Sequence, residues 1–153
     1  MSLPPFQRLL DDHADDVLRF LVASLGRHDA DDAFQETFLS ALRAYPKLRN
    51  DDNLRAWLFT IAHRKALDVH RARARRPVPV GAVEDRPAPD PPELEDDWEL
   101  VRGLPPRQRA VLTLRYAVDL QHSEIAAVLG CTEEASRRAA ADGLKALRKE
   151  LVP

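Results

Sequence analysis

Apolar side chains recur every three or four residues through most of the chain, which is the spacing of one face of an α-helix. This spacing predicts a first helix over about residues 4–25, a second from Asp29 to the residue before Pro46, and a third over about 52–75. Asp29 is a favourable N-cap for the second helix. We expect the apolar stripe of that helix to comprise Phe34, Phe38, Ala41, Leu42 and Tyr45. No strand-like alternation interrupts the pattern, so three packed helices are predicted.

Shorter helices are predicted in the second half of the chain, over about 93–102, from Pro106 onward and around 122–129. Gly130 can then adopt a positive φ and turn the chain, and Thr132 can cap a last helix that runs to about Glu150. A short helix, a glycine turn and a longer helix form a helix-turn-helix, whose second helix enters the DNA major groove. The candidate DNA-reading residues are Thr132, Glu133, Glu134, Ser136, Arg137 and Arg138.

The segment between the two halves has a different composition. Residues 77–92 contain six prolines, and residues 77–99 carry eight acids against the single Arg86. Proline lacks a backbone donor and disfavours helix before it, and such a segment buries too little apolar area to offset its chain entropy. The sequence therefore predicts an all-α protein with two small domains, 1–76 and 93–153, joined by a flexible linker over 77–92.

The chain has 23 basic and 25 acidic side chains, but a basic run lies at the end of the third predicted helix. Only Asp68 opposes it, and its members are Arg64, Lys65, Arg71, Arg73, Arg75 and Arg76. A run of this kind attracts nucleic-acid phosphates. The other interpretation is a solvated helix end that is favoured by the helix dipole.

Catalytic and metal-binding patterns find little support. His63 and His70 lie seven residues apart and, with Asp68, could share a metal ion, but arginines flank them and no HExxH spacing occurs. The only cysteine, Cys131, has no evident base partner. We therefore expect no catalytic residue, no metal and no cofactor. The chain shows no signal-peptide pattern and no apolar run long enough for a membrane span, so a cytoplasmic location is expected.

Three segments, taken in order, resemble the extracytoplasmic-function (ECF) group of bacterial RNA polymerase sigma factors. Residues 30–38 resemble the region 2.2 signature, and residues 55–62, with Asp68 and Arg71, resemble regions 2.3 and 2.4. Residues 104–111, followed by 124–126 and 129–130, resemble region 4. The resemblance spans nearly all of the chain apart from the linker.

This resemblance implies a set of partners and roles. Asp31, Asp32, Gln35 and Glu36 would bind core RNA polymerase. The end of the third helix would contact the minus-ten promoter element through Arg64, Lys65, Asp68, Arg71 and Arg75. The loop 46–53 would hold a base flipped out of the duplex, and the last helix would read the minus-thirty-five element. The expected partners are core polymerase, promoter DNA and an anti-sigma factor, and the chain itself is expected to be a monomer.

Two other functions fit parts of the pattern. The family often has Thr, Val and two arginines where this chain has Ala135, Ser136, Ala139 and Asp142. One alternative is therefore an interaction protein that binds polymerase or a regulator while its last helix no longer reads DNA. The other is a stand-alone helix-turn-helix repressor, which would bind DNA without polymerase and as a symmetric dimer.

Overall fold

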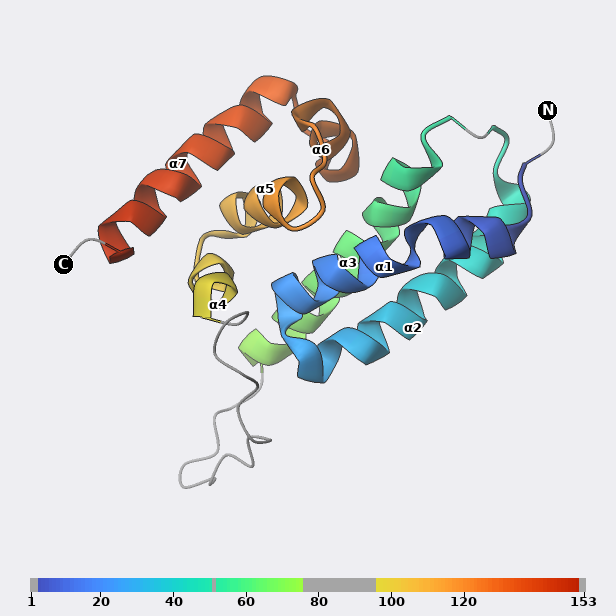
Figure 1. Cartoon of the computed structure of the whole chain (residues 1–153), viewed down its shortest axis with the longest axis horizontal. Helices are drawn as coiled ribbons and strands as arrows, with labels where there is room; N and C mark the ends of the chain where they lie inside the picture. The colour runs from blue at the N-terminus through green and yellow to red at the C-terminus, as the bar shows by residue number, and fades with distance from the viewer. Residues whose placement is uncertain (1–2, 51, 76–95, 152–153) are drawn as a thin grey trace.

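The computed structural model describes residues 3–50, 52–75 and 96–151, and within these ranges the regular structure is entirely helical (Figure 1). The elements are α1 (Phe6–Leu25), α2 (Arg27–Ala44), the 3-10 helix η1 (Tyr45–Lys47), α3 (Leu54–Arg75), α4 (Asp96–Arg102), α5 (Pro106–Tyr116), α6 (His122–Leu129) and α7 (Glu133–Leu151). The all-α prediction is confirmed. The predicted linker over 77–92 lies outside the described residues.

The first domain consists of α1, α2 and α3, as the apolar periodicity predicted. Gly26 ends α1 with φ +83°, a value that favours glycine, and the chain reverses there at once. The second helix consequently begins at Arg27, and the prediction that Asp29 would be its N-cap is wrong, because Asp29 lies inside the first turn. The third helix begins two residues later than expected, where the Asn53 side chain accepts the N–H of Ala56 (3.2 Å).

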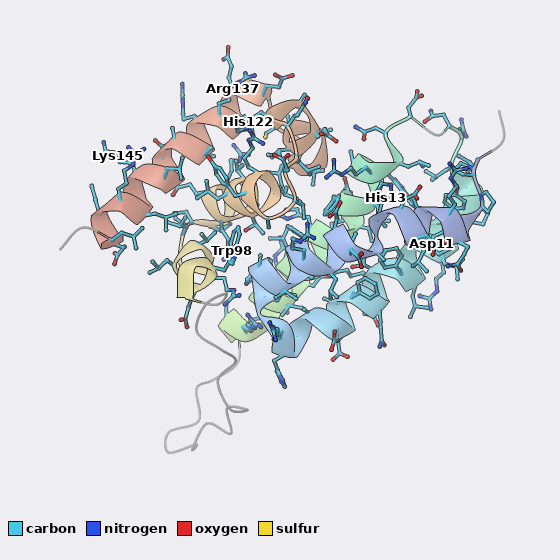
Figure 2. All side chains as sticks on the ribbon, viewed as in Figure 1. Asp11, His13, Trp98, His122, Arg137 and Lys145 are labelled. Atoms are coloured by element: carbon cyan, nitrogen blue, oxygen red, sulfur yellow. The ribbon has the colours of Figure 1, made fainter. Side chains whose placement is uncertain are left out.

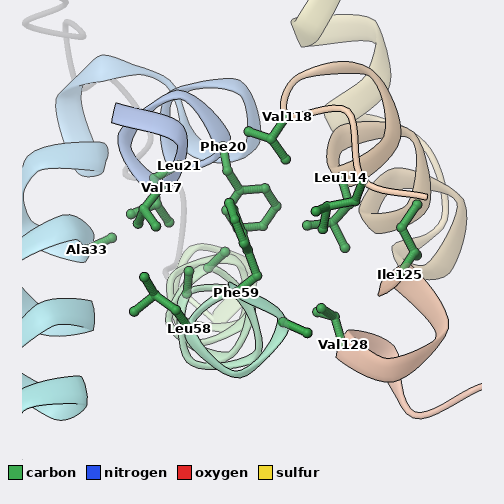
Figure 3. Close-up of a cluster of buried hydrophobic side chains, with 14 of the residues drawn as sticks. Val17, Phe20, Leu21, Ala33, Leu58, Phe59, Leu114, Val118, Ile125 and Val128 are labelled. Atoms are coloured by element: carbon green, nitrogen blue, oxygen red, sulfur yellow. The ribbon is translucent and has the colours of Figure 1, made fainter. Parts of the chain in front are cut away.

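The core of this domain is formed by the inward stripes of the three helices. Val17 and Leu21 of α1, Ala33 of α2 and Leu58 of α3 are almost completely buried and meet in the interior (Figure 3). The prediction that Leu42 belongs to the buried stripe is wrong, because half of this side chain is exposed. Ala41 occupies the buried position beside it, and a helix cannot direct both neighbours to the same side.

The second domain contains the predicted helix-turn-helix. Gly130 takes the left-handed conformation after α6, with φ +69°. The Thr132 hydroxyl accepts the N–H of Ala135 (3.0 Å) and so caps the start of α7, as predicted. Further along α7, a Cβ at Gly143 would lie 2.7 Å from Cδ1 of Leu112 in α5. Glycine therefore permits the close approach of these two helices.

The two domains share one continuous apolar core. Phe20 of α1 and Phe59 of α3 meet edge to face, with ring centroids 5.7 Å apart. The second domain contributes Val118, Ile125 and Val128 to the same cluster of buried side chains (Figure 3). The domains of the unbound chain are therefore packed against each other, with α5 and α6 against α1 and α3.

Candidate polymerase and nucleic-acid interfaces

The predicted polymerase-binding residues lie together on the outer face of α2. All four are exposed: Asp31, Asp32, Gln35 and Glu36. They occupy this face because the opposite side of the helix is taken up by the core. There Ala33 is buried, and the Thr37 hydroxyl donates to the Ala33 carbonyl (2.7 Å). The structure thus brings the four predicted side chains onto one solvent-facing surface.

Two leucines extend this surface, although the sequence patterns did not predict them there. Leu39 is 46% exposed and Leu42 is 50% exposed, which makes them two of the large exposed apolar side chains of the described chain. Their signal in the sequence is the helical spacing, since each lies seven residues after a member of the polar set, Asp32 or Gln35. The α2 face therefore combines acidic and amide groups with an apolar patch.

The basic run at the end of α3 divides into two sets. Arg64, Asp68, Arg71 and Arg75 are all exposed, and their spacing of four, three and four residues places them on one outward face. Arg73 lies on the other side of the helix. Its guanidinium donates to the Leu25 carbonyl (2.7 Å) and to the Asp29 carboxylate. The outward face is thus available to a phosphate-bearing partner, whereas Arg73 holds α3 against the α1–α2 corner.

Lys65 joins the two candidate surfaces. Its ammonium lies 4.0 Å from the Glu36 carboxylate of α2, and its side chain is more buried than that of Glu36. The predicted minus-ten residue Lys65 and the predicted polymerase-binding residue Glu36 are therefore neighbours in space. The α2 face and the start of the basic run are thus adjacent on the surface.

The inner face of α3 carries two histidines that the second domain covers. The His70 ring nitrogen lies 3.3 Å from the Ser24 hydroxyl. Burial, assisted by the nearby Arg109 of α5, lowers the pKa of both His63 and His70 to about 4. Both rings are therefore neutral at neutral pH. Within the described ranges, no group of three or more potential metal-ligating side chains comes together.

The loop before α3 presents polar side chains to solvent. Arg49, Asn50 and Asp52 are exposed. Asn53 has φ +55°, a left-handed conformation that asparagine tolerates better than most residues. Its side chain also caps α3, so this residue fixes the direction in which the loop enters the helix. Residue 51, which belongs to the predicted base-holding loop, lies outside the described residues.

The predicted DNA-reading residues of α7 do not all face solvent. Thr132, Glu133, Glu134, Arg137 and Arg138 are exposed, and Figure 2 shows Arg137 pointing away from the body of the protein. Ser136 is fully buried, and its hydroxyl lies 2.7 Å from Nδ1 of His122 in α6. The structure thus removes Ser136 from the candidate reading surface, because the helix rotates it about 100° away from Arg137.

The outward side of α7 also carries basic residues that the helix-turn-helix pattern did not predict as DNA-reading residues. Lys145 and Arg148 are exposed, and the helical spacing places Lys145 two turns after Arg138 on the same side. Arg137 is tied to Glu133 by an ion pair (3.2 Å), whereas Arg138 has no ion pair among the described side chains. Arg138 is therefore the more available arginine at the start of this surface.

Each of the two domains matches a known protein-family model. A family model described as Sigma-70 region 2 matches residues 9–76, and one described as Sigma-70, region 4 matches residues 98–147. The ECF RNA polymerase sigma factor SigD of Mycobacterium tuberculosis is 34% identical over 152 residues, covering 89% of this chain and 72% of SigD. The chain belongs to the ECF RNA polymerase sigma factors. The resemblance found in the sequence is thereby confirmed.

Other relatives of this sigma factor differ in length. SigG of Mycobacterium tuberculosis is 34% identical over 137 residues, which cover 67% of this chain but 36% of SigG. The chain therefore spans about a third of the length of that relative. The solved structure of the sigma factor RpoE in complex with the anti-sigma factor NepR, from Bartonella quintana, has a TM-score of 0.77 at 22% identity, covering 95% of this chain and 96% of RpoE. This likeness shows a shared fold.

No helix in the described part of this sigma factor is long and apolar enough to cross a membrane.

Proposed function

We propose that this sigma factor binds core RNA polymerase and directs it to promoter DNA, where transcription begins. Residues 1–76 would bind polymerase and the minus-ten element, residues 93–153 would bind the minus-thirty-five element, and residues 77–92 would tether the two. The chain would act in the cytoplasm as a non-catalytic subunit. The observation that carries the proposal is the placement of two exposed surfaces of different chemistry side by side on region 2, an acidic and apolar face on α2 and a basic face on α3.

The α2 face has the chemistry of a protein-binding surface. Its carboxylates would complement a basic partner surface and steer the encounter. The exposed Leu39 and Leu42 would bury apolar area once the partner is bound, at about 25 cal/mol for each Å² removed from water. Charge alone gives little net affinity at an exposed surface. The apolar patch would supply the additional binding free energy that a stable interface needs.

The α3 face has the chemistry of a phosphate-binding surface. Arg64, Arg71 and Arg75 would neutralise backbone phosphates of the minus-ten region and release counterions. The neighbouring loop would receive the flipped base, and extruding a base costs a few kcal/mol of stacking. These short-range contacts would offset that cost only when polymerase holds the DNA in place.

The α7 surface is proposed to contact the minus-thirty-five element mainly through Arg138, with Arg137 contributing once its pairing with Glu133 is broken. Because this surface is small, its affinity for DNA would be low by itself. Two weak modules that polymerase holds at a fixed spacing bind together through effective concentration. We also propose an anti-sigma factor as a regulator, which is supported by the complex in which the RpoE fold was solved.

The α2 assignment can be tested by reversing its charge. The double variant Asp32→Lys/Glu36→Lys should bind core polymerase about tenfold more weakly or worse, because two attractive contacts become repulsive. Affinity for labelled core polymerase and run-off transcription are the measurements. The matched control is Asp11→Lys/Asp12→Lys, which makes the same charge change on an exposed turn of α1.

Three results would contradict the proposal in different ways. Unchanged affinity of the α2 variant would remove the docking assignment. Polymerase binding by the wild-type chain without initiation on any promoter would favour the interaction-protein alternative. Tight DNA binding by a symmetric dimer in the absence of polymerase would favour the repressor.

A further inference from the structure

A buried hydrogen bond links the two helices of the helix-turn-helix. Ser136 of α7 is completely buried, and its hydroxyl lies 2.7 Å from Nδ1 of His122, the first residue of α6. His122 itself is only partly buried. Breaking this bond would leave a buried hydroxyl without a partner, which is costly. The His122 ring is therefore held in one orientation beside the start of α7.

The same hydrogen bond decides which ring nitrogen of His122 carries the proton. Burial lowers the pKa of His122, and the guanidiniums of Arg115 and Arg137 lower it further. The Glu133 carboxylate acts in the opposite direction but does not outweigh them. The ring is therefore neutral at neutral pH and carries a single proton. In the described part of the chain the Ser136 hydroxyl has no acceptor besides Nδ1, so its hydrogen belongs to that bond and the ring proton lies on Nε2.

The second ring nitrogen of His122 is accessible to solvent. Within the described ranges Nε2 makes no hydrogen bond to another protein group. Nor is it a buried atom without a partner, since the one side-chain atom of that kind among the described residues is Nε of Arg55. The N–H at Nε2 is therefore a fixed and unoccupied donor on the surface of the second domain.

This donor lies beside the surface proposed to contact the minus-thirty-five element. Ser136 falls in the middle of residues 132–138, so its partner ring lies against the same two turns of α7. Arg137 is the next residue of α7 and is close enough for its charge to act on His122 (Figure 2). A phosphate near Arg137 would consequently come within reach of the ring. A neutral N–H gains strength as a donor when its acceptor is a charged phosphate oxygen.

We propose that His122 is a DNA-contacting residue of this sigma factor, whose Nε2–H donates to a backbone phosphate at the minus-thirty-five element while the buried hydroxyl of Ser136 holds the ring in place. The inference rests on the proposed function, since it concerns the same α7 surface. A phosphate contact fixes the register and orientation of a recognition helix without reading a base. Because His122 belongs to α6 and Ser136 to α7, one contact would orient both helices on the duplex. This anchor would supplement the small charge that the start of α7 offers.

The test asks whether His122 contacts one particular phosphate. Holoenzyme containing the full chain is bound to duplexes of one promoter on which it initiates transcription. In each duplex a single phosphate of the minus-thirty-five region is replaced by an uncharged methylphosphonate. The wild-type chain is compared with His122→Asn and Ser136→Ala. The control is His13→Asn, which makes the same change at a partly buried histidine of α1.

The asparagine variant separates the two roles of the ring. Its Oδ1 is as many bonds from the backbone as Nδ1 of histidine and can accept the hydrogen of Ser136. His122→Asn thus removes the Nε2 donor while keeping an acceptor for the buried hydroxyl. Circular dichroism and thermal unfolding of each free variant establish that it is folded at the assay temperature.

We expect His122→Asn to weaken promoter binding by about 3- to 10-fold, which corresponds to the loss of one hydrogen bond. At one phosphate, methylphosphonate should weaken binding of the wild-type chain by at least this factor. At the same phosphate it should weaken binding of His122→Asn less than about 2-fold, because that contact is already absent. Ser136→Ala should lose part of the sensitivity at this phosphate, since the ring is no longer held. His13→Asn should match the wild-type chain at every phosphate.

Two results would overturn the inference while the holoenzyme still initiates transcription. If His122→Asn keeps wild-type affinity, or wild-type sensitivity at every phosphate, His122 does not contact the DNA backbone. If Ser136→Ala keeps full sensitivity at the phosphate that His122 contacts, Ser136 does not position the ring. A wild-type chain that forms no holoenzyme, or a holoenzyme that initiates on no promoter, would overturn the proposed function and this inference with it.

Discussion

The outward face of α3 and the start of α7, both proposed to contact DNA, differ in how much charge they offer. The outward face of α3 presents three arginines against Asp68, all of them exposed. The first two turns of α7 present two arginines against Glu133 and Glu134, and one of those arginines is already paired. Because sequence-independent affinity follows the number of phosphates neutralised, region 2 should supply most of the affinity for DNA.

The inward faces of the same helices differ as well. α3 carries Phe59, His63 and His70 toward the second domain, so its inner side is part of the domain junction. α7 buries Ala139 and Gly143 instead, small residues that allow it to lie close to α5. The inner side of α3 therefore faces the second domain, whereas the inner side of α7 packs within its own domain.

The largest expected effect comes from removing the charge of α3. The triple variant Arg64→Ala/Arg71→Ala/Arg75→Ala should weaken promoter binding by holoenzyme about 30- to 100-fold. It should also reduce the slope of log affinity against log salt concentration by about 3, since each arginine contributes about one phosphate contact. Promoter binding measured over a salt series checks both numbers.

The control for this variant loses the same charge elsewhere, as Arg8→Ala/Arg19→Ala/Arg107→Ala at exposed positions of α1 and α5, and its salt slope should be that of wild type. If the α3 variant keeps the wild-type slope of log affinity against log salt concentration, the outward face of α3 does not contact phosphates. The expected larger contribution of α3 to DNA affinity would then be wrong.

A smaller effect separates the two arginines of α7. Arg138→Ala should weaken binding to the minus-thirty-five element by about 1–2 kcal/mol, whereas Arg137→Ala should cost less. Arg137 must first leave Glu133, an exposed ion pair worth roughly 0.3–0.5 kcal/mol. Footprinting of holoenzyme over the upstream element is the measurement. Equal losses from both substitutions would show that the Glu133 pairing does not persist when DNA is bound.

The smallest effect concerns acidity and the inner face of α3. The pKa of His63 and of His70 falls from the ordinary 6.5 to about 4 in the folded chain. Between about pH 4 and 6.5 the unfolded chain therefore binds more protons, and the free energy of unfolding decreases as the pH is lowered through this window. Above about pH 6.5 these two groups contribute no pH dependence. The loss at pH 5 should be on the order of 1 kcal/mol per histidine after allowance for partial exposure.

Thermal unfolding of the free chain between pH 7.5 and 5 checks this expectation. The double variant His63→Gln/His70→Gln keeps neutral polar side chains and should lose most of the pH dependence over that range. Identical pH slopes in the variant and the wild-type chain would mean that other groups, outside the domain junction, control the response to acid.

Local sequence patterns predicted the helices and most of the candidate surface residues. Periodicity was sufficient for α1 and α3, and a glycine followed by a capping threonine was sufficient for the helix-turn-helix. The errors arose where one residue type suits two environments. Leu42 fits an apolar stripe but lies outside it, Ser136 fits a polar surface but is buried against His122, and Asp29 fits an N-cap but pairs with Arg73.

The sequence by itself determined the all-α class and the order of the two regions, because helix periodicity and capping act over a few residues. Only the tertiary structure decided that the basic run of α3 divides between solvent and the α1–α2 corner. It alone decided that Arg55 and Arg102 join the domains across gaps of 63 and 79 residues to Val118 and Ala23. Contacts between residues so far apart in the sequence depend on how whole helices pack, and a local sequence pattern does not predict that packing.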